Sequence, residues 1–220
     1  MTTWRVEPPR LAGTWKAFRQ VPHREVALYH SAGAPTPDQP SGRWHRVGEG
    51  YAQYLALEPL AAWAELVRNE NIRSTAQALA FERDLYLALV EETDIADLSS
   101  FDAYERCGLD PRIAVGDHSV SQDLADELRA ARFRGILSPS AALPFGTSLT
   151  LFGERYEKVL PTGLERWTNP DPTRRVPVTL TATGTLPTGL LMSTCFDGMR
   201  HEAYRQWLRD NGKPAPSGPP

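Results

Sequence analysis

Apolar residues in the first half of the chain are grouped in short stretches separated by turns, which predicts strands and short helices. Strands are expected at 25–29 and 51–57, with an irregular, proline-rich loop at 34–42 between them. Pro59 at the first helical position predicts a helix to about Asn69. The apolar run within 83–91 could extend a helix, but its length and polar bounds favour a buried strand.

Helical signals are strongest in two other places. Ser74 and Gln77 form a capping box that predicts a helix to about Phe81. Residues 119–131 carry apolar side chains at helical spacing, with a serine cap at the start, and Gly135 is expected to end this helix. The remaining expected elements are a polar turn at 138–141, strands at 136–137, 147–152, 176–181 and 190–194, and a helix near 199–209.

Composition and charge narrow the choice of partners. A net charge of −3 gives no general attraction for phosphate backbones, so direct nucleic-acid binding is not expected. The longest strongly apolar run, 85–90, is far below the roughly 20 residues of a membrane helix, and the N-terminus lacks a signal peptide's apolar core. Cys107 and Cys195 suggest no disulfide framework, which fits the cytoplasm, and the five histidines lack the spacing of a metal site.

Arg43 and Tyr54 each allow an ordinary and a functional interpretation. Arg43, in Gly42-Arg43-Trp44, could be a solvated surface charge, or it could grip a diphosphate through bidentate bonds while the glycine lets the backbone approach a ligand. Tyr54, on an apolar strand, could be a buried tyrosine with a satisfied hydroxyl, or a stacking wall for a planar cationic ring such as nicotinamide.

Glu65 and Ser140 are the other two candidates. Ala61 and Ala62, one turn before Glu65, leave space in which a ligand could approach its carboxylate, although Glu65 could equally pair with Arg68 at the surface. A buried carboxylate beside a sugar can stabilise an oxocarbenium-like transition state. Ser140 lacks the Gly-x-Ser-x-Gly elbow of a nucleophile, so it is expected to bond ribose or a local backbone group.

Order and spacing connect these residues. Arg43, Tyr54 and Glu65 follow one another at intervals of eleven residues, and Ser140 lies far downstream after a helix. This pattern resembles the RES domain family. The segments that carry the resemblance, within about Glu25 to Gly153, are Leu28-Tyr29-His30, Ser41–Trp44, Tyr54–Ala56, Ala64-Glu65, Gly135–Ala141 and Ser148–Phe152.

The resemblance implies a mixed α+β fold related to ADP-ribosyltransferases, with central β-sheets flanked by helices and a C-terminal extension. The expected division is an N-terminal extension at 1–24, the RES domain at 25–155, an extension packed on it at 156–212 and a disordered tail at 213–220. Known RES proteins are toxins that degrade NAD by hydrolysis or phosphorolysis and are inhibited by an antitoxin with a helix-turn-helix-type domain.

The resemblance thus implies NAD as substrate. No separate cofactor is expected, and the histidine spacing already gave no reason to expect a metal. It also implies catalytic roles for Arg43, Tyr54, Glu65 and Ser140. The residues expected to contact NAD are Tyr29, His30, Arg43, Trp44, Tyr54 and Ser140.

Three hypotheses remain open. The family commonly has an arginine in place of His30 and an asparagine in place of His45, and these two departures are the reason for the third hypothesis. The first is an enzyme that cleaves the nicotinamide glycosidic bond of NAD, with water or phosphate as acceptor. The second is a transferase that places ADP-ribose on a protein. The third is a catalytically decayed RES domain that serves as a binding module.

Overall fold

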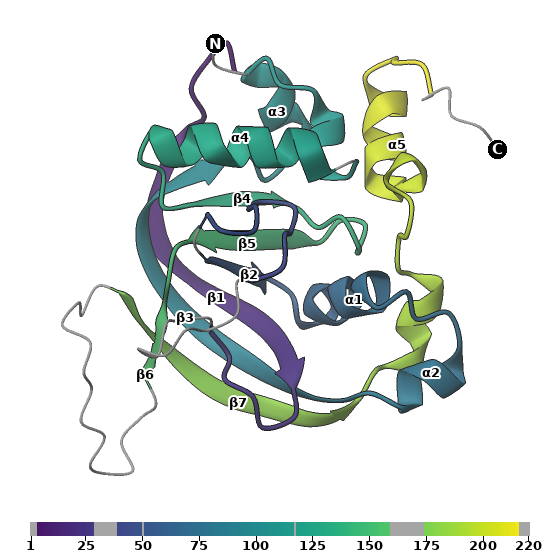
Figure 1. Cartoon of the computed structure of the whole chain (residues 1–220). Coiled ribbons are helices and arrows are strands. Elements are labelled where there is room, and N and C mark those ends of the chain that lie inside the picture. The colour runs from purple at the N-terminus through teal and green to yellow at the C-terminus, as the bar shows by residue number, and fades with distance from the viewer. Residues whose placement is uncertain (1–3, 29–38, 50, 117, 159–173, 216–220) are drawn as a thin grey trace.

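The computed structural model describes residues 4–28, 39–49, 51–116, 118–158 and 174–215, and it has a mixed α+β fold (Figure 1). The strands are β1 (Arg10–Pro22), β2 (Ala52–Ala56), β3 (Glu82–Asp97), β4 (Gly135–Pro139), β5 (Thr147–Phe152), β6 (Tyr156–Lys158) and β7 (Arg175–Thr185). The α-helices are α1 (Pro59–Asn69), α2 (Thr75–Leu79), α3 (Phe101–Arg106), α4 (His118–Ala130) and α5 (Glu202–Asp210). Short 3-10 helices are η1 (Pro111–Ala114), η3 (Thr188–Met192) and η4 (Gly198–Arg200).

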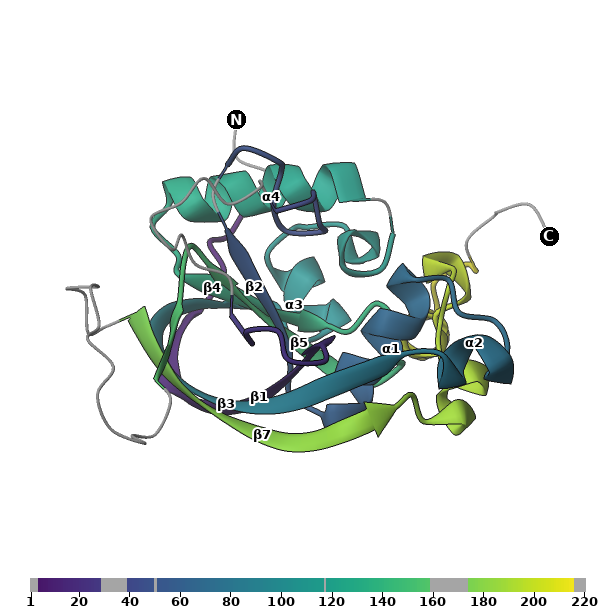
Figure 2. The same ribbon diagram turned by 60° about the horizontal axis from the view of Figure 1, so that its bottom comes forward.

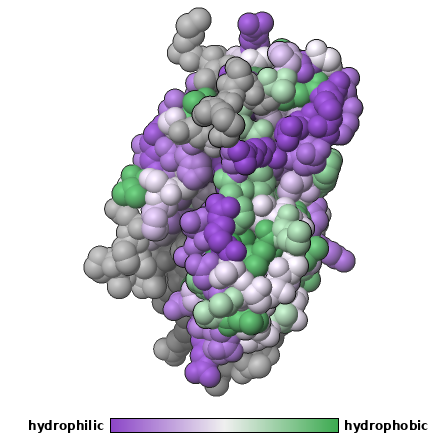
Figure 3. Space-filling view, turned by 90° about the vertical axis from the view of Figure 1, so that its right-hand side faces the viewer, coloured by the Kyte–Doolittle hydropathy of each residue, from purple (hydrophilic) through white to green (hydrophobic). Residues whose placement is uncertain are grey.

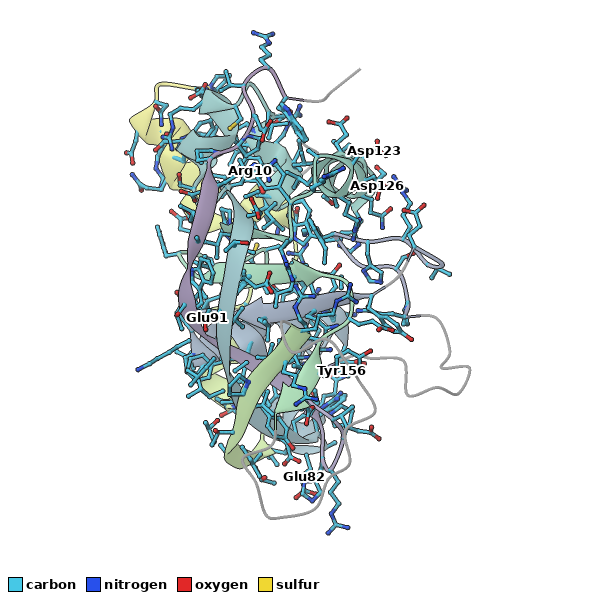
Figure 4. The ribbon with its side chains drawn as sticks, turned by 90° about the vertical axis from the view of Figure 1, so that its left-hand side faces the viewer. Arg10, Glu82, Glu91, Asp123, Asp126 and Tyr156 are labelled. Carbon is cyan, nitrogen blue, oxygen red and sulfur yellow. The ribbon has the colours of Figure 1, made fainter. Side chains whose placement is uncertain are left out.

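The strands form one strongly curved sheet in the order β1-β2-β5-β4-β3-β7-β6. Strand β1 also pairs with β3, in an antiparallel register that runs from Arg10 opposite Ala96 to Pro22 opposite Arg83. The sheet therefore closes on itself through β1, β2, β5, β4 and β3, as Figure 2 shows. Figure 4 shows the two long strands side by side, with Arg10 at one end and Glu82 at the other.

Helices pack at two places around this sheet. Helices α3, α4 and α5 lie on the side of β4 and β5, where a cluster of buried residues that includes Trp44, Leu124 and Trp207 joins them to the sheet. Helix α1 packs between β1, β2 and η3 through a second cluster that includes Trp63 and Leu190. No helix within the described ranges is long and apolar enough to cross a membrane.

Several local predictions are confirmed. The strand expected at 51–57 is β2, and the helix expected from Pro59 to Asn69 is α1. Ser74 and Gln77 form the capping box of α2, although that helix already ends at Leu79. The apolar run at 83–91 is a strand, and from Ala88 onward its residues alternate between buried and exposed, because only one side of β3 contacts the core.

The predictions of strands at 25–29 and 190–194 are wrong for the residues that the structure describes. Residues 25–28 form no strand, because the Leu28 N–H is bonded to the Glu157 side chain instead of to a neighbouring strand, and Tyr29 lies outside the described residues. Residues 188–192 form η3 instead, and Thr194 bonds back to the Leu190 carbonyl through both its N–H and its hydroxyl.

The turn between α4 and β5 also differs from the prediction. Helix α4 ends at Ala130 and the chain reverses at Arg132, whose φ is 65°. Gly135 belongs to β4, where a Cβ would come within 2.5 Å of the Thr150 carbonyl oxygen, so this glycine is required by strand packing. Ser138 and Pro139 belong to β4 as well, so the turn begins only at Ser140.

The division at 1–24, 25–155, 156–212 and 213–220 stays a prediction. Strand β1 nevertheless pairs with β2 and β3 inside the closed part of the sheet. Lys213 is anchored at the end of α5, since its N–H donates to Leu208 and its side chain pairs with Glu105.

Candidate functional site

The segment from Gly42 to His45 is a tight turn held against α4. The Gly42 N–H donates to the His45 carbonyl at 3.1 Å. From α4, the Gln122 amide donates to the carbonyls of Gly42 (2.8 Å) and His45 (3.3 Å). Arg46, at the end of the turn, forms ion pairs with Asp123 and Asp126, which Figure 4 labels on the exposed side of α4. Helix α4 thus fixes the position of Arg43.

Tyr54, on β2, occupies the space beside Gly42. A Cβ on Gly42 would lie 2.4 Å from the Tyr54 hydroxyl oxygen, so the glycine makes room for this tyrosine. The Trp44 N–H donates to the same oxygen at 2.8 Å, and His45 Nδ1 is hydrogen-bonded to it at 2.9 Å. Burial raises the pKa of Tyr54 to about 12, so its hydroxyl stays protonated at neutral pH. Its half-buried ring lines the cavity that is described below.

Arg43 is a buried cation, 9% exposed. Its Nη1 donates to the carbonyls of Gly116 (2.9 Å) and Ile113 (3.3 Å), which anchors the guanidinium in the loop before α4. Burial and the nearby positive charge of Arg68 lower its pKa to about 10, while Glu65 acts in the opposite direction. Arg43 therefore remains charged at neutral pH and lies within electrostatic range of Glu65.

Glu65 lies on α1, and its carboxylate is held by hydrogen bonds from the loop after β4. Its Oε1 accepts a hydrogen bond from the Ser140 hydroxyl at 2.9 Å and one from the Ala142 N–H at 3.3 Å. These two donors fix the carboxylate of a residue that lines the cavity described below. The surface pair with Arg68 is not what fixes it, because Arg68 donates to the Ala141 carbonyl instead.

Ser140 itself is fully buried. Besides donating to Glu65, its hydroxyl oxygen accepts the N–H groups of Leu143 (3.1 Å) and Ala142 (3.3 Å). The hydroxyl is thus fully engaged within the protein, and its geometry is that of a group that orients Glu65.

A cavity of about 610 Å³ brings three of the predicted catalytic residues together. It lies between β1, β2, α1 and the ends of β4 and β5, and its walls include Arg43, Trp44, Tyr54, Ala62, Glu65, Arg68 and Thr150. The Thr150 hydroxyl is buried with no hydrogen-bond partner among the described residues. Trp44 is only 2% exposed and packs mainly in the core. Tyr29 and His30 lie outside the described residues.

A second, larger cavity of about 860 Å³ lies on another face, between α2, η3, η4 and the loop after β4. It contains none of the predicted site residues; its walls include Arg73, Phe145, Cys195 and Glu202. Arg43, Arg68 and the Glu65 carboxylate all line the smaller cavity, so we assign the candidate site there. Within the described ranges, no group of three or more His, Cys, Asp or Glu side chains could hold a metal ion.

Several residues that hold the site together were given no such role from the sequence. Gln122 and His45 fix the turn that carries Arg43, and Arg68 contributes a second positive charge to the cavity wall. His201, at the start of α5, donates from Nε2 to the Ser140 carbonyl at 2.9 Å, although 61 residues separate the two. The sequence pattern suggested Arg68 only as a surface partner of Glu65, one turn earlier, whereas His201 carries no local signal.

Comparisons with known proteins identify the family and the fold of this chain. The family model of the RES domain matches residues 2–177. A protein of Mycobacterium tuberculosis named "Probable NAD(+) phosphorylase Rv3189" is 28% identical over 116 residues, which are 53% of this chain and 55% of that protein. The chain therefore matches about half the length of this curated relative.

A solved structure supports the fold. A chain of the crystal structure of the M. tuberculosis MbcT–MbcA toxin–antitoxin complex superposes with a TM-score of 0.56 at 22% identity, and the match covers 83% of this chain and 90% of that one. The likeness shows that the two folds correspond. Since the family model covers most of the sequence, this chain belongs to the RES domain family.

Proposed function

We propose that this protein cleaves the N-glycosidic bond between nicotinamide and ribose in NAD. The observation that carries the proposal is the oriented carboxylate of Glu65, held by Ser140 and Ala142 at the wall of a cavity that also holds Arg43 and Arg68. An anion fixed beside two cations suits a substrate that has a diphosphate and develops positive charge on its ribose.

Each side chain has a distinct role in this proposal. Arg43 and Arg68 attract the diphosphate, with Arg43 using the guanidinium N–H groups that do not donate to Gly116 and Ile113. Tyr54 presents its ring to nicotinamide, and Glu65 stabilises the cation that forms at C1′ of ribose. Ser140 acts by orienting Glu65. Trp44, Tyr29 and His30 are proposed to complete the NAD-binding wall.

The reaction breaks the bond from C1′ to the nicotinamide nitrogen, and nicotinamide leaves with the bonding electrons. A water or phosphate oxygen then bonds to C1′ and loses its proton to solvent. Phosphate is the preferred acceptor in this proposal, because the curated relative is named an NAD(+) phosphorylase. A protein side chain as acceptor, which would make the chain an ADP-ribosyltransferase, is the alternative.

The proposal extends to the protein's setting. The solved structure with the corresponding fold is of a toxin–antitoxin complex, which supports an antitoxin, expected to carry a helix-turn-helix-type domain, as the partner of this chain. Cys107 and Cys195 are both free and buried, which suits the proposed cytoplasmic location.

Nicotinamide release from NAD, measured with and without phosphate, tests the activity. Glu65→Gln keeps the shape of the side chain and its bond from Ser140 but removes the charge, so turnover should fall by about 10²–10³ while the fold is retained. The matched control is Glu91→Gln, at an exposed position of β3, which should behave like the wild type.

Each outcome separates the hypotheses. Release that requires phosphate identifies a phosphorylase, and release without it a glycohydrolase. Label from NAD that stays on protein identifies a transferase. An equal rate in Glu65→Gln and the wild type would contradict the role of Glu65, and the absence of both release and NAD binding would favour a decayed binding module.

A further inference from the structure

The segment after β7 lies beyond the part of the chain that matches the RES domain model, yet it reaches the candidate site. It runs through η3 and η4 into α5, on the right-hand side of the molecule in Figure 1. Figure 3 shows this face, on which apolar surface lies between hydrophilic regions. Behind it, the segment packs against residues 140–146, called here the Ser140 loop.

Three carbonyl groups in succession hold the Ser140 loop in place. The Ser140 carbonyl accepts a hydrogen bond from His201 Nε2 at 2.9 Å, and the Ala142 carbonyl accepts the Cys195 N–H at 2.7 Å. Between them, the Ala141 carbonyl accepts from Arg68. Two of these three donors come from the C-terminal segment. The same loop supplies the hydroxyl and the N–H group that orient Glu65.

His201 uses both ring nitrogens. While Nε2 donates to Ser140, Nδ1 accepts the N–H of Tyr204 at 3.3 Å and thereby caps α5. This pair of bonds requires the neutral ring with its proton on Nε2. The ring is fully buried, with Phe101 packed edge-on at 6.0 Å between ring centroids. Burial lowers the pKa of His201 to about 4, which keeps the ring neutral at physiological pH.

The loop conformation itself needs external support. Phe145 has a φ of 66°, in the left-handed region that bulky residues rarely adopt, and its side chain is 73% exposed, so its own packing does not stabilise this conformation. The Ser140 N–H closes the loop by donating to the Gly146 carbonyl at 2.8 Å. Within the loop, the Ala142 and Leu143 N–H groups donate to the Ser140 hydroxyl. Donors from outside the loop fix the position of this whole arrangement relative to Glu65.

We infer that His201 is a positioning residue for the reaction: by holding the Ser140 carbonyl, it sets the hydroxyl that orients the Glu65 carboxylate. The inference rests on the proposed NAD cleavage for its catalytic meaning. It gives the C-terminal segment a role in the site, through a chain of contacts from α5 to the Ser140 loop and then to α1.

Two substitutions separate positioning from stability. In His201→Asn, the side-chain oxygen can still cap α5 at the position of Nδ1, but the side chain is too short to reach the Ser140 carbonyl. In His201→Gln, the amide nitrogen can replace Nε2 as donor, while the cap is lost. If His201 served only to cap α5, activity would be kept in His201→Asn and lost in His201→Gln. If His201 positions the Ser140 loop, activity is kept in His201→Gln, which still donates to the Ser140 carbonyl, and lost in His201→Asn.

The expected result is a split between kcat, KM and thermal stability. His201→Asn should lower kcat for nicotinamide release by between about 10- and 100-fold, because the displaced carboxylate no longer meets the transition state, with little change in KM. Its melting temperature should also fall, because the buried Ser140 carbonyl loses its donor. His201→Gln should retain most of kcat although it melts earlier. Wild-type kcat in His201→Asn, or activity that parallels stability in both variants, would overturn the inference.

Amide hydrogen exchange provides a readout that does not depend on catalysis or on His201→Gln folding. In His201→Asn, the Ala142 and Leu143 amides, which donate to Glu65 and to the Ser140 hydroxyl, should exchange faster than in the wild type. Unchanged exchange at both amides would refute the positioning role even if the wild type releases no nicotinamide. Such an inactive wild type would by itself contradict only the proposed function.

Discussion

Gly42 shows how the absence of one side chain determines the geometry of the site. The Tyr54 hydroxyl fills the volume where a Cβ would stand, and from there it accepts the Trp44 N–H and bonds to His45. The glycine therefore serves the packing of Tyr54 against the turn. The functional interpretation of the sequence instead linked this glycine to the approach of a ligand, because the pattern around it does not say which group needs the space.

Gly42→Ala should displace Tyr54 and destabilise the fold by about 1–3 kcal/mol, the usual penalty for an added methyl group in a packed site. Nicotinamide release should fall with it, since Tyr54 lines the cavity. Chemical denaturation and the release assay measure the two effects. The matched control is Gly184→Ala on β7, where a Cβ meets nothing within 4 Å. Equal stability and turnover in Gly42→Ala and Gly184→Ala would contradict the close approach of the Tyr54 hydroxyl to Gly42.

At the scale of elements, Asp84 joins three parts of the sheet. Its carboxylate, on β3, accepts the Thr183 hydroxyl from β7 at 2.6 Å and the Arg24 N–H at 2.8 Å, and it pairs with His23 at 3.0 Å. These hydrogen bonds, led by the one from Thr183, lower the pKa of Asp84 to about 2. One side chain thus connects β3, β7 and the turn after β1.

Asp84→Asn should lower the free energy of unfolding at pH 7 by about 1–3 kcal/mol through weakened charge-assisted bonds. Because the folded-state pKa lies below the ordinary value, the contribution is present above that value and disappears as the pH falls through about 2. The difference in the free energy of unfolding between the wild type and Asp84→Asn should therefore become smaller below pH 4. Exposed Asp210→Asn is the control, and a difference that stays constant down to pH 2 would contradict the linkage.

Elements with strong local signals were predictable from the sequence, and those defined by distant contacts were not. Pro59 and the Ser74–Gln77 box gave the correct starts of α1 and α2. Strand β1 was missed because Gly13 and Arg19 interrupt its weak alternation, although pairing with β3 along its whole length makes it a strand. The η3 segment is apolar like a strand, but Thr194 bonds back to Leu190.

At the scale of the whole molecule, the site combines segments that no local pattern relates. The family motifs identified Arg43, Tyr54 and Glu65, and the folded chain brings these three to one cavity. The contribution of α5 through His201 depends on how the C-terminal segment packs on α3, where Tyr204 and Trp207 meet Phe101. Composition and periodicity carry no information about that packing, so His201 could not be predicted.

Because β1, β2, β5 and α1 all contribute to the cavity wall, NAD binding should stabilise the entire fold. At a free NAD concentration of about 100 times Kd, linkage adds about 2.7 kcal/mol, which for a domain of this size raises the melting temperature by roughly 5–10 °C. Glu65→Gln is the best protein for this measurement, because it should bind NAD without consuming it. The rise in melting temperature of Glu65→Gln with NAD should equal that of the wild type measured before NAD is consumed. The reason is that Glu65 acts on charge that develops only in the transition state. A shift in the wild type that is lost in Glu65→Gln would mean that Glu65 binds the ground state, and its role in catalysis would then have to be revised.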